Sequence, residues 1–219
     1  SVATMIGPQT RALLPVDLFG GLADYGKLRA FGLPIVEDAC QAVGAGTMIC
    51  HGEIAAISLN GTKNIPAGEA GAVVTNADHL ADRVRRWVSH GENWWFPEVG
   101  LNARLNEPTA LLAWHGLQLL EARNAARRRL ATTLIRQLRG HPKIRTLPDP
   151  TGHALYVLPL VLAQGVDRAR FAVRLVAMGV EVSQGYLTPH IADYPAFKAC
   201  RRAPLPVVTE LSERSLCLF

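Results

Sequence analysis

The stretch RALLPVDLFGGLADYGKLRAFGLPIVEDA, residues 11–39, decides the fold that the sequence predicts. Two short apolar runs, at 11–20 and 33–39, enclose a polar segment in which Tyr25 and Leu28 recur at helical spacing. This order predicts a strand, a helix and a second strand. Because short apolar strands joined by a helix are typical of parallel sheets covered on both faces, the sequence predicts an α/β fold.

Polar side chains follow these strands at the edge where such a sheet carries its chemistry. Asp17 and Asp38 lie at the carboxyl ends of the two predicted strands, and two further strands are predicted at 53–60 and 71–76. The turn-rich segment between the later strands contains Lys63. Since the chemistry of a parallel sheet lies beyond the carboxyl ends of its strands, we expect Asp38 and Lys63 to point into one crevice.

Helical patterns dominate the middle of the chain. After a predicted helix at 78–89, Asn106 is expected to cap a long helix that has Pro108 in its first turn. The predicted apolar stripe of this long helix consists of Leu112, Leu119, Ala126, Leu130, Leu134 and Leu138. Gly140 is expected to end it.

The last third of the chain predicts a small α+β unit, with a strand at 153–162, a helix at 167–178 and a strand at 180–184. The sequence thus predicts three parts. They are a large-domain portion at 1–106, a connecting helix at 107–140 and a small C-terminal domain at 141–219.

Composition excludes several classes of protein. The chain has 219 residues, 49% hydrophobic and 19% charged, which is enough to bury a core. Its net charge of +5 is spread along the chain and falls short of a nucleic-acid-binding signature. No apolar run approaches the roughly 18 to 20 residues of a membrane span. The four cysteines lack metal-ligand spacing, so reduced thiols and a cytoplasmic location are expected.

Lys63 is notable because lysine is rare in this chain. Only four of the 23 basic residues are lysines, so a lysine in a weakly charged segment stands there either by chance or for amine chemistry that arginine cannot perform. A lysine beside Asp38 could form an ordinary ion pair. The pair also matches pyridoxal phosphate, which binds a lysine as a Schiff base and needs an acid beside its ring nitrogen. Gln41 and Ser58 are spaced to contact the ring hydroxyl and the phosphate.

Three blocks of the sequence resemble one known family. They are VEDACQAVGA at 36–45, ISLNGTKNIPAGEAGAVVTN at 57–76, and SHGENWW at 89–95 followed by GLNARLNEPTALLAWHGLQLLE at 100–121. In order and spacing they resemble the DegT/DnrJ/EryC1/StrS family, the sugar aminotransferases of pyridoxal-phosphate fold type I. The resemblance implies half of a fold type I large domain, with a mostly parallel sheet, and a small α+β C-terminal domain.

The resemblance also implies roles for five residues. Lys63 would form the Schiff base with pyridoxal phosphate and move protons. Asp38 would pair with the pyridinium nitrogen, while Gln41 would contact the ring hydroxyl and Ser58 the phosphate. Asn102 would reach the phosphate bound by the neighbouring subunit, which implies a homodimer with shared active sites.

The sequence departs from the family pattern at several positions. Val43 replaces a common histidine, Ala70 a glycine and Ala103 a tyrosine, and none of these changes removes a cofactor-binding group. Near the substrate, Tyr186 and His190 would contact the sugar or simply pack the small domain. Likewise, Trp94 and Trp95 would form either a sugar platform or a subunit contact.

The resemblance implies a reaction and leaves alternatives open. The expected activity is amino-group transfer, from glutamate, to a keto sugar attached to a nucleotide. Relatives of this kind also dehydrate sugars or build aminobenzoate-type precursors. The family's N-terminal phosphate cradle and stacking aromatic ring are not found in this sequence, nor is its last helix. The chain is therefore expected to be a fragment or a truncated product, and a non-catalytic remnant or a regulatory cofactor-binding module stays an alternative.

Overall fold

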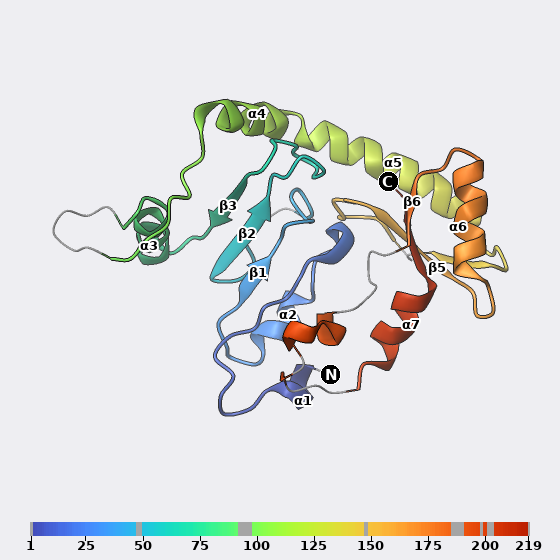
Figure 1. Cartoon of the computed structure of the whole chain (residues 1–219), viewed down its shortest axis with the longest axis horizontal. Coiled ribbons are helices and arrows are strands. Elements are labelled where there is room, and N and C mark those ends of the chain that lie inside the picture. Colours follow the sequence, from blue (N-terminus) through green and yellow to red (C-terminus); the bar gives the residue numbers. More distant parts are fainter. Residues whose placement is uncertain are drawn as a thin grey trace. The chain divides into compact units, whose positions relative to one another are not determined.

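The computed structural model describes residues 2–46, 50–91, 98–146, 149–184, 191–197, 199–200 and 204–218. The chain forms two compact units (Figure 1). The first unit contains Ser1–Arg128 and Gly152–Tyr156, and the second contains Arg129–Thr151 and Val157–Phe219.

The first unit is built on a three-stranded sheet of order β1-β2-β3 (Figure 1). Its strands are β1 (Val36–Asp38), β2 (Ile54–Ser58) and β3 (Gly71–Val74). The pairing of β1 with β2 is parallel, as the sequence predicts, but β3 runs antiparallel to β2, so the sheet is mixed.

The predicted strand at 11–20 is wrong as a continuous element. Only two isolated parallel bridges form there, Leu13 with Ile35 and Val16 with Asp38, and Leu18–Gly20 is a 3-10 turn. Pro15 lies between the bridges and has no N–H to extend the ladder.

Short helices α1 (Val2–Met5) and α2 (Tyr25–Arg29) belong to the same unit. The sequence predicts α2, whose cap Asp24 accepts a hydrogen bond from the backbone N–H of Lys27. One core cluster of the unit consists of Val43, Leu59, Ile65, Ala67 and Leu120. Its members come from the segments that follow β1 and β2 and from the start of α5.

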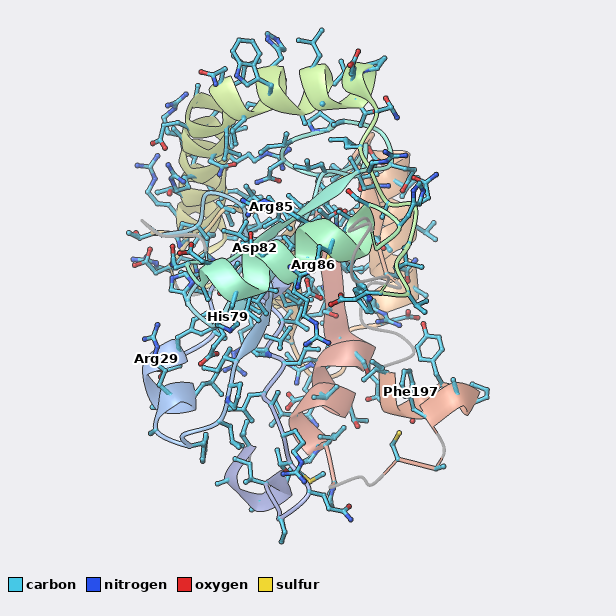
Figure 2. The ribbon with its side chains drawn as sticks, turned by 90° about the vertical axis from the view of Figure 1, so that its left-hand side faces the viewer. Arg29, His79, Asp82, Arg85, Arg86 and Phe197 are labelled. Carbon is cyan, nitrogen blue, oxygen red and sulfur yellow. The ribbon has the colours of Figure 1, made fainter. Side chains whose placement is uncertain are left out.

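Helix α3 (Asp78–Val88) confirms the helix predicted at 78–89. It contains no buried residue, and Figure 2 shows Asp82, Arg85 and Arg86 along it. Asp82 and Arg85 form an exposed ion pair at 3.0 Å. At such exposure this pair contributes little to the free energy of unfolding.

The predicted long helix is two helices, α4 (Glu107–Gln118) and α5 (Leu120–Leu138), which meet at Leu119. The predicted cap is confirmed, since the side chain of Asn106 accepts a hydrogen bond from Thr109 N at 3.0 Å. The predicted apolar stripe is wrong: Leu112 is 57% exposed and Leu130 is 73% exposed. The buried positions of α5 are Leu120, Asn124, Ala131 and Ile135.

The second unit contains a four-stranded antiparallel sheet of order β4-β5-β7-β6 (Figure 1). Its strands are β4 (Ile144–Thr146), β5 (Leu158–Leu162), β6 (Val182–Ser183) and β7 (Ser215–Leu218), and its main helices are α6 (Arg168–Ala177) and α7 (Pro206–Arg214). Short 3-10 turns at Ile191–Asp193 and Pro195–Phe197 complete it.

This sheet and its helices form the predicted small α+β arrangement. The core is formed by Leu162, Ala172 and Leu216. The strand predicted at 153–162 begins only at Leu158, because the backbone before it turns through a positive φ of 49° at Leu155.

All four cysteines are unpaired, with Cys50 and Cys217 buried and Cys200 exposed. Among the described residues, no helix combines the length and apolar character needed to cross a membrane.

Candidate functional site

The loop after β2 places Lys63, and Asn60 holds that loop in shape. The backbone N–H of Lys63 donates to Asn60 O at 2.9 Å, and that of Thr62 donates to Asn60 Oδ1 at 3.0 Å. The side-chain amide of Asn60 in turn donates to Glu69 at 2.7 Å. Asparagine commonly organises a tight turn in this way, so Lys63 projects from a backbone that is well held.

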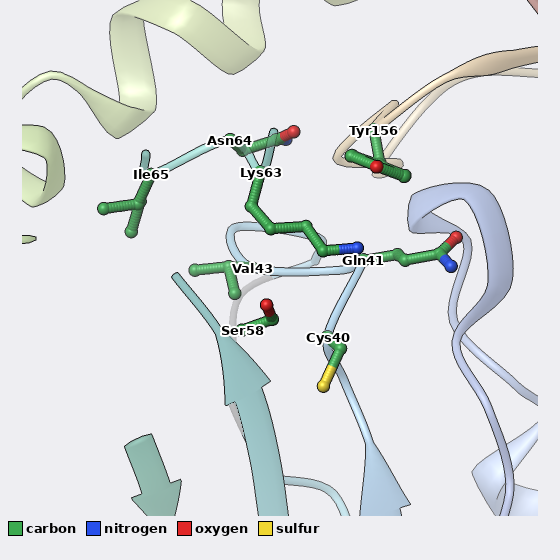
Figure 3. A pocket seen from close by; sticks show the side chains of 8 residues that line it. All are labelled: Cys40, Gln41, Val43, Ser58, Lys63, Asn64, Ile65 and Tyr156. Carbon is green, nitrogen blue, oxygen red and sulfur yellow. The ribbon is translucent and has the colours of Figure 1, made fainter. Parts of the chain in front are cut away.

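Lys63 lies in a small pocket of the first unit (Figure 3). The polar residues of its wall are Cys40, Gln41, Ser58, Lys63, Asn64 and Tyr156. The Lys63 ammonium lies 4.1 Å from the centre of the Tyr156 ring. Among the described residues, no carboxylate lies within ion-pair distance of this ammonium. The ordinary ion pair with Asp38 that the sequence allowed does not form.

Gln41 and Ser58 lie in the same pocket wall. Gln41 follows β1, and its Oε1 accepts a hydrogen bond from Phe19 N at 2.7 Å. Because Oε1 accepts this bond, the two hydrogens on the amide nitrogen of Gln41 remain available to other acceptors. Ser58 is the last residue of β2 and its Oγ accepts from Asn60 N at 3.3 Å. The structure therefore brings together Gln41, Ser58 and Lys63.

Asp38 lies next to this group but does not line the pocket. It is the last residue of β1, and its backbone bonds to both sides of Val16, with Asp38 N donating to Pro15 O and Asp17 N donating to Asp38 O. Its Oδ1 accepts a hydrogen bond from Cys40 N at 3.1 Å. The carboxylate is thus fixed at the edge of the sheet that the sequence predicts.

The thiol of Cys40 lies in the same pocket wall. Burial, and then the hydrogen bond and charge of Asp38, raise the pKa of this thiol to about 11. It is therefore a neutral thiol near pH 7, and a neutral thiol is a poor nucleophile. Of the thiol and the amine in this pocket, the amine of Lys63 is the one suited to forming a Schiff base.

Asn102, the last of the five predicted site residues, does not line this pocket. Asn102 is exposed and pairs with Ser89 in an isolated antiparallel bridge. The residues Trp94, Trp95, Tyr186 and His190 lie outside the described residues.

Sequence reasoning missed Cys40, Asn64 and Tyr156. Asn64 directly follows Lys63, so its position was a signal that could have been used. Tyr156 lies 93 positions after Lys63 in a stretch read as a strand. No sequence pattern indicates that Leu155 turns the chain and directs Tyr156 to the lysine.

The pocket residues fit pyridoxal phosphate in their chemistry. They supply an amine without a carboxylate partner, a hydroxyl and an amide donor, and a carboxylate lies next to them on the end of β1. An amine for covalent attachment and an acid for the ring nitrogen are what this cofactor requires. The fold is that of the pyridoxal-phosphate-dependent transferases of fold type I.

Comparison with known proteins narrows this class. The chain belongs to the DegT/DnrJ/EryC1/StrS aminotransferase family, which it matches over residues 1–219. Membership of this family indicates pyridoxal phosphate as the cofactor.

Three similar proteins illustrate the family. The erythromycin biosynthesis sensory transduction protein EryC1 of Saccharopolyspora erythraea is 36% identical over 99% of this chain and 62% of its own length. The dTDP-3-amino-3,4,6-trideoxy-alpha-D-glucose transaminase of Streptomyces venezuelae is 35% identical over 99% of this chain and 60% of its own. The crystal structure of S. venezuelae DesV in complex with a ketimine intermediate has a TM-score of 0.89 and 32% identity, over 99% of this chain and 62% of that one.

The chain spans about 60% of the length of the curated relatives it matches. A dehydratase has the same fold: E coli GDP-4-keto-6-deoxy-D-mannose-3-dehydratase has a TM-score of 0.89, over 99% of this chain and 64% of that one. At 17% identity this likeness concerns the fold alone.

Proposed function

We propose that this chain is the lysine-bearing part of an aminotransferase that acts on a nucleotide-linked keto sugar with glutamate as amino donor. One observation carries the proposal: the amine of Lys63 lies in a pocket with Gln41 and Ser58, and no described carboxylate pairs with it. The transaminase among the relatives, which is named for a dTDP-linked amino sugar, supports this class of substrate.

Lys63 binds the cofactor covalently and then moves protons. Pyridoxal phosphate, when bound, withdraws electrons from the substrate carbon next to the amino nitrogen. Lys63 is a primary amine on a flexible stem, so it can take a proton from that carbon and return it elsewhere.

Three residues orient the cofactor in this proposal. The carboxylate of Asp38 keeps a proton on the ring nitrogen, because a negative charge at that atom favours its protonated form. Gln41 donates from its amide to the ring hydroxyl, since its carbonyl is already bonded to Phe19 N. Ser58 donates its hydroxyl to the phosphate.

Covalent labelling tests the role of Lys63. The chain is incubated with pyridoxal phosphate, reduced with borohydride and mapped by mass spectrometry. We expect the pyridoxyl group on Lys63, and its loss in Lys63→Arg, which keeps the charge but cannot form the bond. Lys27 is a matched internal control, since it is exposed and paired with Asp24 at 2.7 Å. Labelling of Lys27 in preference to Lys63 would contradict the proposal.

The substrate class is tested on the longest available form of the protein. Nucleotide-linked keto sugars are supplied with glutamate, and both products are measured. We expect 2-oxoglutarate and an amino sugar in equal amounts. A sugar that loses a hydroxyl group and retains no nitrogen would indicate dehydration instead.

We also propose a homodimer in which Asn102 contacts the cofactor of the partner subunit. Support comes from α4, which exposes four large apolar side chains: Leu111, Leu112, Trp114 and Leu117. Burial against a second copy would remove this apolar surface from water. Sedimentation should show a dimer, and Asn102→Ala should weaken cofactor retention without lowering the unfolding temperature. A monomer that retains the cofactor contradicts this arrangement.

We also propose a cytoplasmic location, which the four unpaired thiols support.

A further inference from the structure

Tyr156 has a contact with Lys63 that the proposed function does not use. The ammonium of Lys63 lies over the Tyr156 ring, 4.1 Å from its centre. The tyrosine itself is only 8% exposed. A cation within about 6 Å of an aromatic face is attracted to it, and the attraction grows as water is removed. The ring is thus a binding surface for the charged amine.

The hydroxyl of Tyr156 contacts the loop after β2 that carries Lys63, called the lysine loop below. It lies 3.2 Å from Thr62 Oγ1, and the Thr62 hydroxyl donates its single hydrogen to Asn60 Oδ1 at 2.9 Å. Because a threonine hydroxyl has only one hydrogen to give, Tyr156 is the donor in its bond with Thr62. Ring and hydroxyl therefore hold two successive residues of the lysine loop.

The backbone that carries Tyr156 is fixed in turn. Arg127 donates from Nη1 to Leu155 O at 3.2 Å and to Tyr156 O at 3.1 Å. Leu155 has a φ of 49°, which is uncommon for a residue other than glycine. Such a conformation persists where the surrounding contacts determine it, and it is often found at functional sites.

A buried pair of amides joins this backbone to the lysine loop. Asn64 donates from Nδ2 to Ala154 O and to Asn124 Oδ1, both at 2.9 Å, and Asn124 donates to Val43 O at 3.1 Å. The carbonyl oxygens of Ala154 and Val43 can only accept hydrogen bonds. The Nδ2 atoms of Asn64 and Asn124 must therefore face them, which fixes the orientation of both side-chain amides. Asn64 Oδ1 is buried and without a hydrogen-bond partner in the described structure. The position of Asn64 is therefore fixed by its two donated hydrogen bonds, to Ala154 and to Asn124.

From these contacts we infer that Tyr156 is a positioning residue for Lys63. Its ring binds the charged amine whenever Lys63 is not covalently bonded and holds it in the pocket with Gln41 and Ser58 (Figure 3). A lysine side chain otherwise has many conformations, and restricting them keeps the amine close to where it reacts. The inference rests on the proposed role of Lys63, but the contact itself can be measured without any cofactor.

The test is an NMR experiment on the 219-residue chain without cofactor. Its four lysines are methylated reductively with ¹³C-formaldehyde, which keeps the charge of each amine. Methyl groups over an aromatic face resonate upfield. We expect an upfield signal that is absent from Lys63→Arg and displaced from the signal of Lys27, the exposed reference. Two variants separate ring from hydroxyl: Tyr156→Phe should keep the upfield shift, and Tyr156→Met, which fills similar space without an aromatic face, should lose it.

Each result supports or overturns the inference. It is overturned if the Lys63 signal of the unaltered chain coincides with that of Lys27, a result that needs no variant to fold. It is also overturned if Tyr156→Met keeps the shift while its unfolding transition stays cooperative, or if Tyr156→Phe loses it. Pyridoxal labelling of Lys63 is a separate measurement. Failure of the proposed function therefore shows as absent labelling, whatever the NMR result.

Discussion

Asp17→Asn should change how the stability of the first unit depends on pH. Asp17 is fully buried beside the N-terminal end of α2. Its Oδ1 accepts hydrogen bonds from Ala23 N at 2.8 Å and from the hydroxyl of Tyr25 at 3.0 Å. Glu37, only 1% exposed, adds a second buried carboxyl. Burial, with a further contribution from Glu37, raises the pKa of Asp17 from 3.8 to about 6.

The magnitude follows from this raised pKa. A shift from 3.8 to about 6 corresponds to about 3 kcal/mol, at roughly 1.36 kcal/mol per pH unit. Because the folded state binds the proton more tightly, the stabilising contribution is fully present below pH 3.8. It is lost as the pH rises towards 6. Between pH 4.5 and 7 the free energy of unfolding should therefore fall by about 2 kcal/mol on account of Asp17.

Urea denaturation across this pH range measures the effect. An asparagine cannot titrate, so the free energy of unfolding of Asp17→Asn minus that of the unaltered chain should rise by about 2 kcal/mol from pH 4.5 to 7. Asp24→Asn is the matched control. This exposed acid is in the same segment and its hydrogen bond to Lys27 lowers its pKa, so its difference curve should be flat over that range. A flat curve for Asp17→Asn as well would refute the reasoning.

Four further predictions concern single residues. Asn124→Leu removes two buried hydrogen bonds and should lower the free energy of unfolding by about 2–4 kcal/mol, measured by urea denaturation. Gly44→Ala should cost more than about 1 kcal/mol by the same assay, since φ is +82° and the new Cβ would lie 2.4 Å from Asn124 Nδ2. Leu216→Ala should cost about 2–5 kcal/mol, because Leu216 is fully buried in the core of the second unit. Asp38→Asn should leave pyridoxal labelling of Lys63 measurable, but should lower turnover of the longest available protein at least about tenfold. Unchanged turnover would remove Asp38 from its proposed role.

The sequence predicts well those features that depend on neighbouring residues. The loop that carries Lys63 is predicted by an apolar strand and the run of turn residues after it. The cap at Asn106 is predicted by one side chain and the helix that it starts. Both are local. The direction of β3 could not be predicted, because the turn-rich segment before it is compatible with either a hairpin or a crossover.

Long-range features were predicted poorly. The strand at 11–20 reads as apolar and continuous, but Pro15 interrupts its ladder. In the pocket, Gln41 and Ser58 follow from their nearness in sequence to Asp38 and Lys63. Tyr156 arrives from a distant segment through the turn at Leu155, which leaves no mark in the amino-acid pattern.

The burial of Asn124 explains why the apolar stripe of α5 was predicted at the wrong positions, and the same residue bonds to Asn64 in the lysine loop. A polar residue such as Asn124 is normally assigned to the exposed face of a helix, and that assignment shifts the predicted stripe away from the true one. In the structure Asn124 is 1% exposed, on the same face as Leu120. Its burial is possible only because Asn64 and Val43 satisfy its amide. An apolar residue at this position would satisfy the helical pattern, but it would leave the amide of Asn64, next to Lys63, without one of its two acceptors. Helix α5 therefore departs from the amphipathic pattern at Asn124, the residue that accepts a hydrogen bond from Asn64 beside Lys63.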